Sequence, residues 1–367
     1  MTRLGLYAGG FLGPFGGGVI AVLIPELRED FDATTAAVSL GITAYMVPFA
    51  VLQLVSGTLG ERLGIARTVR VAYIVYAFAS VAAAFAPGIG AFLGFRALQG
   101  GANAFLTPLL LAALTETAAP GTVGRTVGTF VAVQTSALVA SPLLGGLLGG
   151  VSWRLAFVLP AVIAVALACQ ALPGTRTAHA QPPRLRSALT RRVGLLSAAS
   201  FLSYMCSAGL AFLVALRAAD AFGLGSTARG ALVAGFGVVG ILAARPAGDL
   251  ADRRGRVTAV FAGAAISAVA IGTVGLAGTV AELALAWAVA GAGTALIWAG
   301  LNTMAVEAVA GNRAGALSVV SAFRFAGNAI APVLWLPLYE ARASTAFLLA
   351  GAGCVALGVI TLGLRQS

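Results

Sequence analysis

The stretch GDLADRRGR, residues 248–256, lies between two long apolar runs and has a weaker copy, GTLGERLG, at residues 57–64. The two copies begin 191 residues apart. Other residues pair at nearly the same separation: Gly100 with Gly291 and Glu116 with Glu307 at 191 residues, and Pro142 with Pro332 and Phe157 with Phe347 at 190. Five matches at one offset predict a chain of two halves that are built on the same plan.

The composition predicts a protein that crosses a membrane many times. Of its 367 residues, 59% are hydrophobic and only 10% are charged, and the mean hydropathy is +0.97. Soluble globular proteins have about a quarter charged residues, so a soluble enzyme is excluded. A bilayer-spanning helix needs about 20 apolar residues, and the apolar runs predict an all-α integral membrane fold of twelve transmembrane helices. The predicted spans are residues 5–24, 38–59, 69–86, 91–113, 125–148, 155–172, 194–216, 229–248, 257–277, 281–304, 314–336 and 344–364.

The positive charges predict how the chain is oriented and divided. The chain has 23 Arg and no Lys, and most of the arginines lie in the breaks between apolar runs. Such residues collect on the cytoplasmic side, and their count places both termini in the cytoplasm. Residues 174–193, with five arginines, are predicted to be a cytoplasmic basic linker between an N-terminal six-helix half (1–173) and a C-terminal six-helix half (194–367). The arginines form no surface stripe, so nucleic-acid binding is not expected. Paired six-helix halves are typical of transporters in which one half rocks against the other around a central substrate site.

Several motifs resemble those of the major facilitator superfamily. The stretch at 248–256 resembles the signature loop after the second helix of each half, and Arg96-Ala97-Leu98-Gln99-Gly100 resembles an Arg-x-x-Gln-Gly element of the fourth helix. The start of the sixth span, with Trp153-Arg154 and Phe157, is similar to that of drug exporters. The fifth span resembles the family's antiporter motif, with Ala137 and Ser141 in place of two glycines, through Gly128, Ala137, Ser141, Pro142, Gly145 and Gly146.

This resemblance implies a twelve-helix drug:proton antiporter in the bacterial cytoplasmic membrane. Such a protein exports small molecules by alternating access, without a cofactor and as a monomer. In the family reading the two signature loops latch the halves in one conformation, and the acids near the cytoplasmic ends of the fourth spans could pair with loop arginines. The first loop departs from the motif, because Glu61 stands for Asp and Ile65 and Ala66 replace basic residues. The latch residues are therefore Gly57, Glu61, Arg62, Gly64, Gly248, Asp252, Arg253, Gly255, Arg256, Glu116 and Glu307.

Arginines inside the spans point to a polar interior. Such residues usually face the bundle interior, because a charge at the bilayer centre costs about 2.5–3.5 kcal/mol on insertion scales. Arg324 lies about ten residues into the eleventh span, or about 15 Å deep, and we favour a substrate role over a bond to a neighbouring helix carbonyl. A positive central cavity predicts an anionic or strongly electronegative substrate. The cavity candidates are Arg324, Asn328, Gln134, Trp298 and Asn302.

The acids argue against the simplest coupling mechanism. All twelve Asp and Glu residues fall in loops or at span ends, and Gly16-Gly17-Gly18 stands where drug exporters often have an acid. Glu26 is the one candidate of the first span, and a pair with Arg96 could link protonation to transport. An equally good reading makes Glu26 an interfacial loop acid. A single His, with the cysteines inside apolar runs, predicts no metal site.

Three function classes follow from the sequence. A secondary exporter, coupled to protons, is favoured by the antiporter-like fifth span. An importer of a small polar or anionic metabolite is the alternative, because Ala137 and Ser141 depart from the antiporter motif and a mid-span acid is lacking. A membrane enzyme or receptor is not expected, since the chain has no mid-span carboxylate and its one His lies in a polar loop.

Overall fold

A computed structural model describes residues 3–119, 122–170, 189–309 and 312–365, without the side chains of residues 313, 314 and 365. The chain forms two compact units, Met1–Pro182 and Pro183–Ser367. Their border falls inside the predicted linker, of which residues 174–188 lie outside the described part. The division into two halves and a linker stays a prediction.

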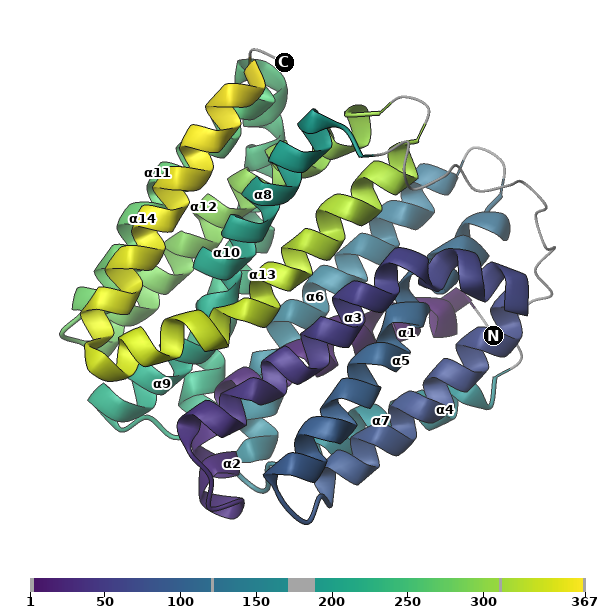
Figure 1. Cartoon of the computed structure of the whole chain (residues 1–367), viewed down its shortest axis with the longest axis horizontal. Helices are drawn as coiled ribbons and strands as arrows, with labels where there is room; N and C mark the ends of the chain where they lie inside the picture. Colours follow the sequence, from purple (N-terminus) through teal and green to yellow (C-terminus); the bar gives the residue numbers. More distant parts are fainter. Residues whose placement is uncertain (1–2, 120–121, 171–188, 310–311, 366–367) are drawn as a thin grey trace. The chain divides into compact units, whose positions relative to one another are not determined.

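The first unit consists of helices that pack around α5. Both α3 and α4 pack on α5, α4 also packs on α7, and α1 packs on α6. In chain order the elements are α1 (Arg3–Gly18), the 3-10 helix η1 (Val19–Val22), α2 (Ile24–Asp30), α3 (Thr35–Leu63), α4 (Ile65–Ala84), α5 (Ile89–Glu116), α6 (Val123–Gly149) and α7 (Leu155–Ala168) (Figure 1).

The second unit repeats these packing partners in the same order. Both α10 and α11 pack on α12, α11 also packs on α14, and α8 packs on α13. Helices about 190 residues apart in the chain thus pack on equivalent neighbours in their own units, which explains the offset seen in the sequence. The elements are α8 (Arg191–Cys206), η3 (Ala208–Leu210), α9 (Ala211–Phe222), α10 (Ser226–Arg254), α11 (Arg256–Leu276), α12 (Val280–Glu307), α13 (Arg313–Ala341), α14 (Ala343–Leu362) and η4 (Gly363–Arg365).

Eleven helical segments in the described residues are long and apolar enough to cross a membrane. Each of the twelve predicted spans overlaps a helix, but the sixth corresponds to α7, which has 14 residues and falls below that length. Helices of the other spans are often longer than predicted, as in α3 and α13 with 29 residues each.

Polar side chains begin several helices where the sequence changes from loop to apolar run. Thr34, Thr190 and Thr279 accept a hydrogen bond from the backbone N–H three residues later, each at 3.2 Å, and Asn312 does the same at 2.9 Å. These caps satisfy N–H groups that the first helical turn leaves without partners.

Two glycines make the sharp turn inside each signature loop. Gly64 joins α3 to α4 and Gly255 joins α10 to α11, and both have a φ of +90°. Residues other than glycine rarely adopt this backbone conformation. The two turns lie 191 residues apart, so the repeat includes the backbone geometry of the loop.

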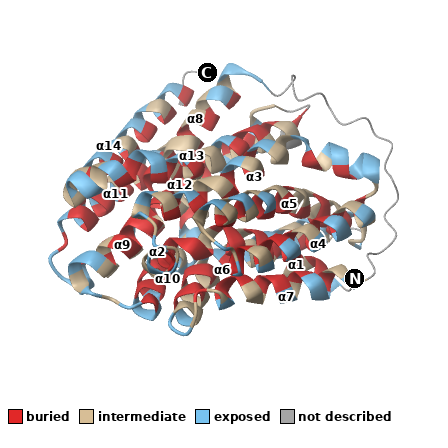
Figure 2. Ribbon diagram, turned by 60° about the horizontal axis from the view of Figure 1, so that its bottom comes forward, coloured by how far each residue is buried: buried red, intermediate tan, exposed pale blue. Residues whose placement is uncertain are grey.

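Another repeated pair of glycines lets helices approach closely. A Cβ on Gly100 of α5 would overlap the carbonyl group of Tyr45 in α3, and a Cβ on Gly291 of α12 would overlap that of Phe236 in α10. Figure 2 shows buried and exposed positions next to one another along the same helices. Large apolar side chains on other faces are exposed, for example Val269 at 72%. Exposed apolar surface of this kind suits a lipid environment.

Candidate functional site

The first span is broken toward its end. Helix α1 contains seven glycines and Pro14, and it gives way at Val19 to the 3-10 helix η1. The last turn of an α-helix leaves its carbonyl groups without intrahelical partners, and a proline removes one N–H donor. The break therefore exposes backbone acceptors within an apolar segment, and these acceptors need partners from elsewhere.

Side chains from four other helices donate to carbonyl groups of α1, two of them in its last turn and two inside the helix before it. Tyr76 of α4 donates to the carbonyl of Leu12 at 3.2 Å, and Tyr45 of α3 donates to that of Gly13 at 3.0 Å. Two further bonds come from Ser141 of α6 to the Phe15 carbonyl at 2.7 Å and from Arg96 of α5 to the Gly16 carbonyl at 2.9 Å. All four donors are buried. We call these four bonds the α1 carbonyl network.

Arg96 is the charged member of this network and is completely buried. Its Nε also donates to the carbonyl of Gly41 in α3 at 3.3 Å, and its Nη1 donates to Gln99 Oε1. Gln99 Nε2 in turn donates to Ser80 Oγ at 2.6 Å. The second terminal nitrogen, Nη2, has no hydrogen-bond partner among the described residues. Backbone and amide dipoles therefore surround this cation.

An aromatic ring covers the Arg96 guanidinium. At the equivalent place in the second unit two aromatic rings stack on each other, and no charged residue takes part. The guanidinium carbon lies 4.4 Å from the centroid of Tyr45. In the second unit Trp287 occupies the position 191 residues later and stacks on Phe236 at 4.5 Å, while its Nε1 donates to the Val233 carbonyl at 3.1 Å. The charge at this position is thus a property of the first half alone.

Glu26, the coupling candidate, lies in the first turn of α2, directly after Pro25, and is half-buried. The segment Gly16–Gly18, where drug exporters often have an acid, instead offers Arg96 a backbone carbonyl. A protonation-linked pair of Glu26 and Arg96 stays a prediction.

The antiporter-like residues of α6 form a contact face against the broken first span. A Cβ on Gly18 would lie 2.9 Å from Ser141 Oγ, and a Cβ on Gly145 would lie 2.9 Å from a methyl group of Val19. Small residues at these positions allow the helices to approach closely. The buried members of the predicted set are Ala137, Ser141, Pro142, Gly145 and Gly146. Gly128 is exposed and would have open space around a Cβ, so it takes no part in this contact.

The seventh span is broken at the equivalent place. Helix α8 ends at Cys206, and the chain continues through η3 into α9. Trp335 of α13 donates from Nε1 to the Met205 carbonyl at 2.8 Å, and Ser207 Oγ lies 3.0 Å from Thr294 Oγ1 of α12. The opening helix of each half is therefore discontinuous and held by side chains of later helices.

Arg324 of α13 lies beside this second break, among aromatic rings. Its guanidinium carbon is 5.2 Å from the ring centroid of Tyr204 and 5.0 Å from that of Phe325. Trp298 stacks on Tyr204 at 5.0 Å and donates from Nε1 to Ser203 Oγ at 3.2 Å. The Nε of Arg324 is buried and has no hydrogen-bond partner among the described residues. We call Arg324, Tyr204, Trp298 and Phe325 the arginine–aromatic cluster.

The other cavity candidates lie at varied places. Asn328 of α13 lies against Gly209 of η3, close to the second break. Asn302 is exposed on α12. Gln134 belongs to the first unit, where its Nε2 lies 3.4 Å from Thr107 Oγ1 of α5. The structure thus brings Trp298 to Arg324 through Tyr204 and leaves Asn302 on the surface of its unit.

The two signature loops differ in their charges. In the second unit Arg256, the first residue of α11, forms an ion pair with Glu307 at the end of α12. Asp252 and Arg256 line a hollow of about 220 Å³ with Ala251 and Gly255. The position equivalent to Arg256 in the first unit is Ile65, an apolar residue. The first unit therefore lacks the positive partner of this ion pair.

Of the remaining latch residues the charged ones are exposed, whereas Gly57 and Gly248 lie within helices α3 and α10. Glu61, Arg62 and Arg253 are exposed at helix ends. A Cβ on Gly57 would meet only Pro108, at 3.9 Å, and a Cβ on Gly248 would have open space. These two glycines therefore are not needed for close contact within their own units.

The α1 carbonyl network was missed by the sequence reasoning. Tyr76 and Ser80 lie four residues apart on α4 and carry hydroxyl groups inside an apolar run, which was the available signal. Their partners on α1 and α5 could not be read from spacing. In the described residues, no group of three or more His, Cys, Asp or Glu side chains could hold a metal ion.

Comparisons with known proteins agree with this architecture. The family model of the Major Facilitator Superfamily matches residues 6–195 and again residues 196–366. A tetracenomycin C resistance and export protein of Streptomyces glaucescens is 30% identical over 149 residues, 40% of this chain and 28% of that protein. A multidrug resistance protein B homologue of Mycobacterium tuberculosis is 30% identical over 167 residues, 44% of this chain and 31% of that protein. The chain thus matches about three tenths of the length of these relatives.

A solved structure shares the fold over nearly the whole chain. It is that of a bacterial homologue of the human lysosomal transporter Spinster, in an inward-facing and occupied conformation. The TM-score is 0.77 at 17% sequence identity, and the match covers 99% of this chain and 94% of the other. At this identity the likeness concerns the fold.

Proposed function

Because the chain belongs to the major facilitator superfamily, we propose that it is a secondary active transporter that exports small molecules by alternating access. It is a multi-pass protein of the bacterial cytoplasmic membrane. In this proposal the chain crosses the membrane twelve times, with α7 as the shortest span and both termini in the cytoplasm. It acts as a monomer, and its partners are a small-molecule substrate, protons and the lipid bilayer.

The observation that carries the proposal is the pair of broken helices, α1 and α8, at equivalent places of two repeated units. Discontinuous helices in matching positions mark substrate and ion sites in transporters built from repeats. The names of the relatives, which describe resistance and export, favour export as the direction. The Arg256–Glu307 ion pair supports a role of the second signature loop in stabilising one conformation.

Glu26 is the candidate residue for proton coupling. Glu26 is the acid that lies nearest along the chain to the first break. If its protonation alternates during transport, the transport rate depends on pH in a way that a Gln at this position abolishes.

The arginine–aromatic cluster supports the proposal that the substrate is anionic or strongly electronegative and carries a ring. Arg324 supplies a positive charge whose Nε has no partner in the described residues, and Tyr204 and Trp298 supply stacking faces. The same cluster would suit the alternative function, import of a small polar or anionic metabolite. Ala137 and Ser141, which depart from the antiporter motif, favour that alternative.

Direction is tested by expression in an efflux-deficient bacterium with a panel of labelled anionic, neutral and cationic compounds. Export lowers accumulation relative to cells with the empty vector, and an ionophore that collapses the proton gradient abolishes the difference. Accumulation above that of the vector control would instead identify an importer.

Substrate charge is tested with Arg324→Gln, and Arg342→Gln serves as the control because Arg342 is an exposed arginine of the same unit. We expect Arg324→Gln to reduce transport of anionic and electronegative compounds, and Arg342→Gln to leave it unchanged. If wild type and Arg324→Gln export cationic dyes equally well and both ignore anions, the charge is structural and the substrate proposal is wrong.

A further inference from the structure

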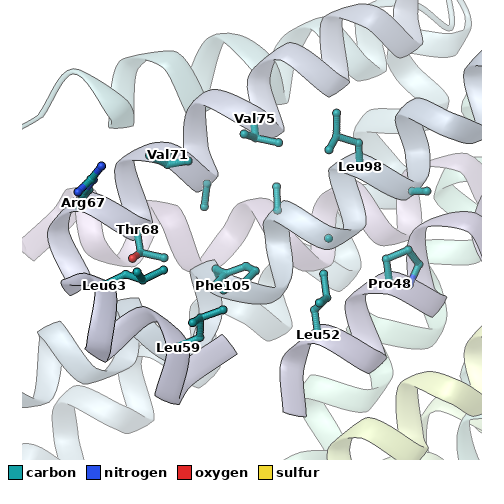
Figure 3. A pocket seen from close by; sticks show the side chains of 14 residues that line it. Pro48, Leu52, Leu59, Leu63, Arg67, Thr68, Val71, Val75, Leu98 and Phe105 are labelled. Carbon is teal, nitrogen blue, oxygen red and sulfur yellow. The ribbon is translucent and has the colours of Figure 1, made fainter. Parts of the chain in front are cut away.

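The first unit has an apolar groove that the proposed transport cycle does not use. The groove has a volume of about 550 Å³ and lies over α5, between α3 and α4 (Figure 3). Both flanking helices pack firmly on α5 and touch each other far less, which leaves the space between them. Its lining residues are Pro48, Leu52, Leu59, Leu63, Arg67, Thr68, Val71, Ala72, Val75, Ala97, Leu98, Gly101, Ala102 and Phe105.

Polarity is confined to one end of this groove. Among the described residues that line it, only Arg67 and Thr68 are polar, and Figure 3 shows both at one end, with Leu98 and Pro48 at the other. The polar end adjoins the signature loop, because Arg67 lies three residues after Gly64. Predicted orientation puts that loop in the cytoplasm, so the groove starts at the cytoplasmic surface and runs toward the membrane centre.

The length of the groove corresponds to one leaflet. From Arg67 to Val75 on α4 the rise is about 12 Å, and from Leu63 to Pro48 on α3 it is about 22 Å. These values bracket about 15 Å, half the thickness of the hydrocarbon core. The groove is open at its side, where Leu63 and Val71 are 58% and 52% exposed.

We propose that this groove binds one anionic phospholipid of the cytoplasmic leaflet, with an acyl chain along α5 and the phosphate at Arg67. The apolar lining fits hydrocarbon, and the cation at the interfacial end fits the headgroup charge, since basic residues at this depth attract anionic lipids. A second copy of this chain would need a charge opposite to Arg67, whereas the lipid provides it. The bound lipid fills the space that separates α3 from α4 next to the first signature loop.

The test uses the purified full chain and native mass spectrometry. The protein is equilibrated with phosphatidylglycerol or phosphatidylcholine of identical acyl chains, and the lipids retained per molecule are counted. We expect wild type to retain one phosphatidylglycerol in preference to phosphatidylcholine. Arg67→Gln is expected to weaken this retention about fivefold, the effect of one arginine near an anionic surface.

Two further variants separate the groove from general attraction. Arg70→Gln removes the same charge one turn further along α4, from an exposed residue that does not line the groove, and we expect normal retention. Gly101→Leu places a side chain toward Leu52 and Pro48 and is expected to reduce retention of both lipids. Equal losses in Arg67→Gln and Arg70→Gln, or retention of phosphatidylcholine as strong as that of phosphatidylglycerol, would overturn the proposal. Normal retention in folded Gly101→Leu would also overturn it.

Discussion

Two tyrosines of α4 offer a matched test of the α1 carbonyl network. Tyr73 and Tyr76 lie almost one turn apart, and both are completely buried. Tyr76 donates its hydroxyl proton to the Leu12 carbonyl at 3.2 Å. The Tyr73 hydroxyl packs over the Cα of Gly9 and has no hydrogen-bond partner among the described residues. Replacement by Phe removes one oxygen in each case, but only one of the two oxygens makes a bond to α1.

The two substitutions are therefore expected to differ in their effect on stability. Tyr76→Phe loses a hydrogen bond within the membrane, which is worth about 0.6 kcal/mol on average and up to about 1.7 kcal/mol. Tyr73→Phe removes a buried hydroxyl that lacks a partner in the described residues, so its effect is neutral or stabilising by up to about 1 kcal/mol. For a domain of this size, each 1 kcal/mol corresponds to a shift of about 2–4 °C in Tm.

The assay is thermal unfolding of the full chain in detergent, followed by intrinsic tryptophan fluorescence. Tyr45→Phe serves as a second positive variant, because Tyr45 donates to the Gly13 carbonyl at 3.0 Å. We expect Tyr76→Phe and Tyr45→Phe to lower the Tm and Tyr73→Phe to leave it unchanged or raised. A Tm that falls as far in Tyr73→Phe as in Tyr76→Phe would refute the assignment of hydroxyl bonds to the broken helix.

Three further outcomes are expected. Asp252→Asn should reduce transport without a loss of membrane insertion, because the loop biases a conformational equilibrium; normal transport at wild-type expression contradicts the latch. Glu26→Gln should flatten the dependence of transport rate on pH, and an unchanged profile moves coupling away from this residue. Gly291→Ala should lower the free energy of unfolding by about 1–3 kcal/mol, because the added Cβ overlaps the Phe236 carbonyl. Gly248→Ala is the control and should be neutral, because a Cβ there has open space around it. Equal Tm values of the two variants would contradict the close contact at Gly291.

The sequence predicted the repeat, because its signals are local. Gly64 and Gly255, which hold matching positions in the two signature loops, both have a positive φ. The sequence predicted that acids near the ends of the fourth spans could pair with loop arginines, without naming the partners, and Arg256 forms an ion pair with Glu307. Hydropathy located a helix for every predicted span, since an apolar segment in a bilayer has to satisfy its own backbone hydrogen bonds.

The breaks in α1 and α8 could not be predicted in the same way. Residues 5–24 and 194–216 read as uninterrupted apolar runs, and hydropathy does not record where a helix changes to 3-10 geometry. The carbonyl groups of α1 are bonded by donors from four helices, and one of these donors, Ser141, lies 126 residues from its acceptor Phe15. Arg96 lies within an apolar span and is buried, and its partners include backbone carbonyls that no residue pattern displays.

The α1 carbonyl network also imposes an order on biosynthesis. The first span leaves the ribosome before any of its four donors, and Ser141 follows the end of η1 by more than a hundred residues. At about 5–20 residues per second, roughly 6–24 s pass before the last acceptor can be bonded. During that interval the glycine-rich first span, whose bonded carbonyls still lack these partners, is expected to stay beside the translocon or an insertase. We therefore expect nascent chains truncated shortly before Ser141 to crosslink to that machinery through the first span, and chains extended well past this residue to be released into lipid.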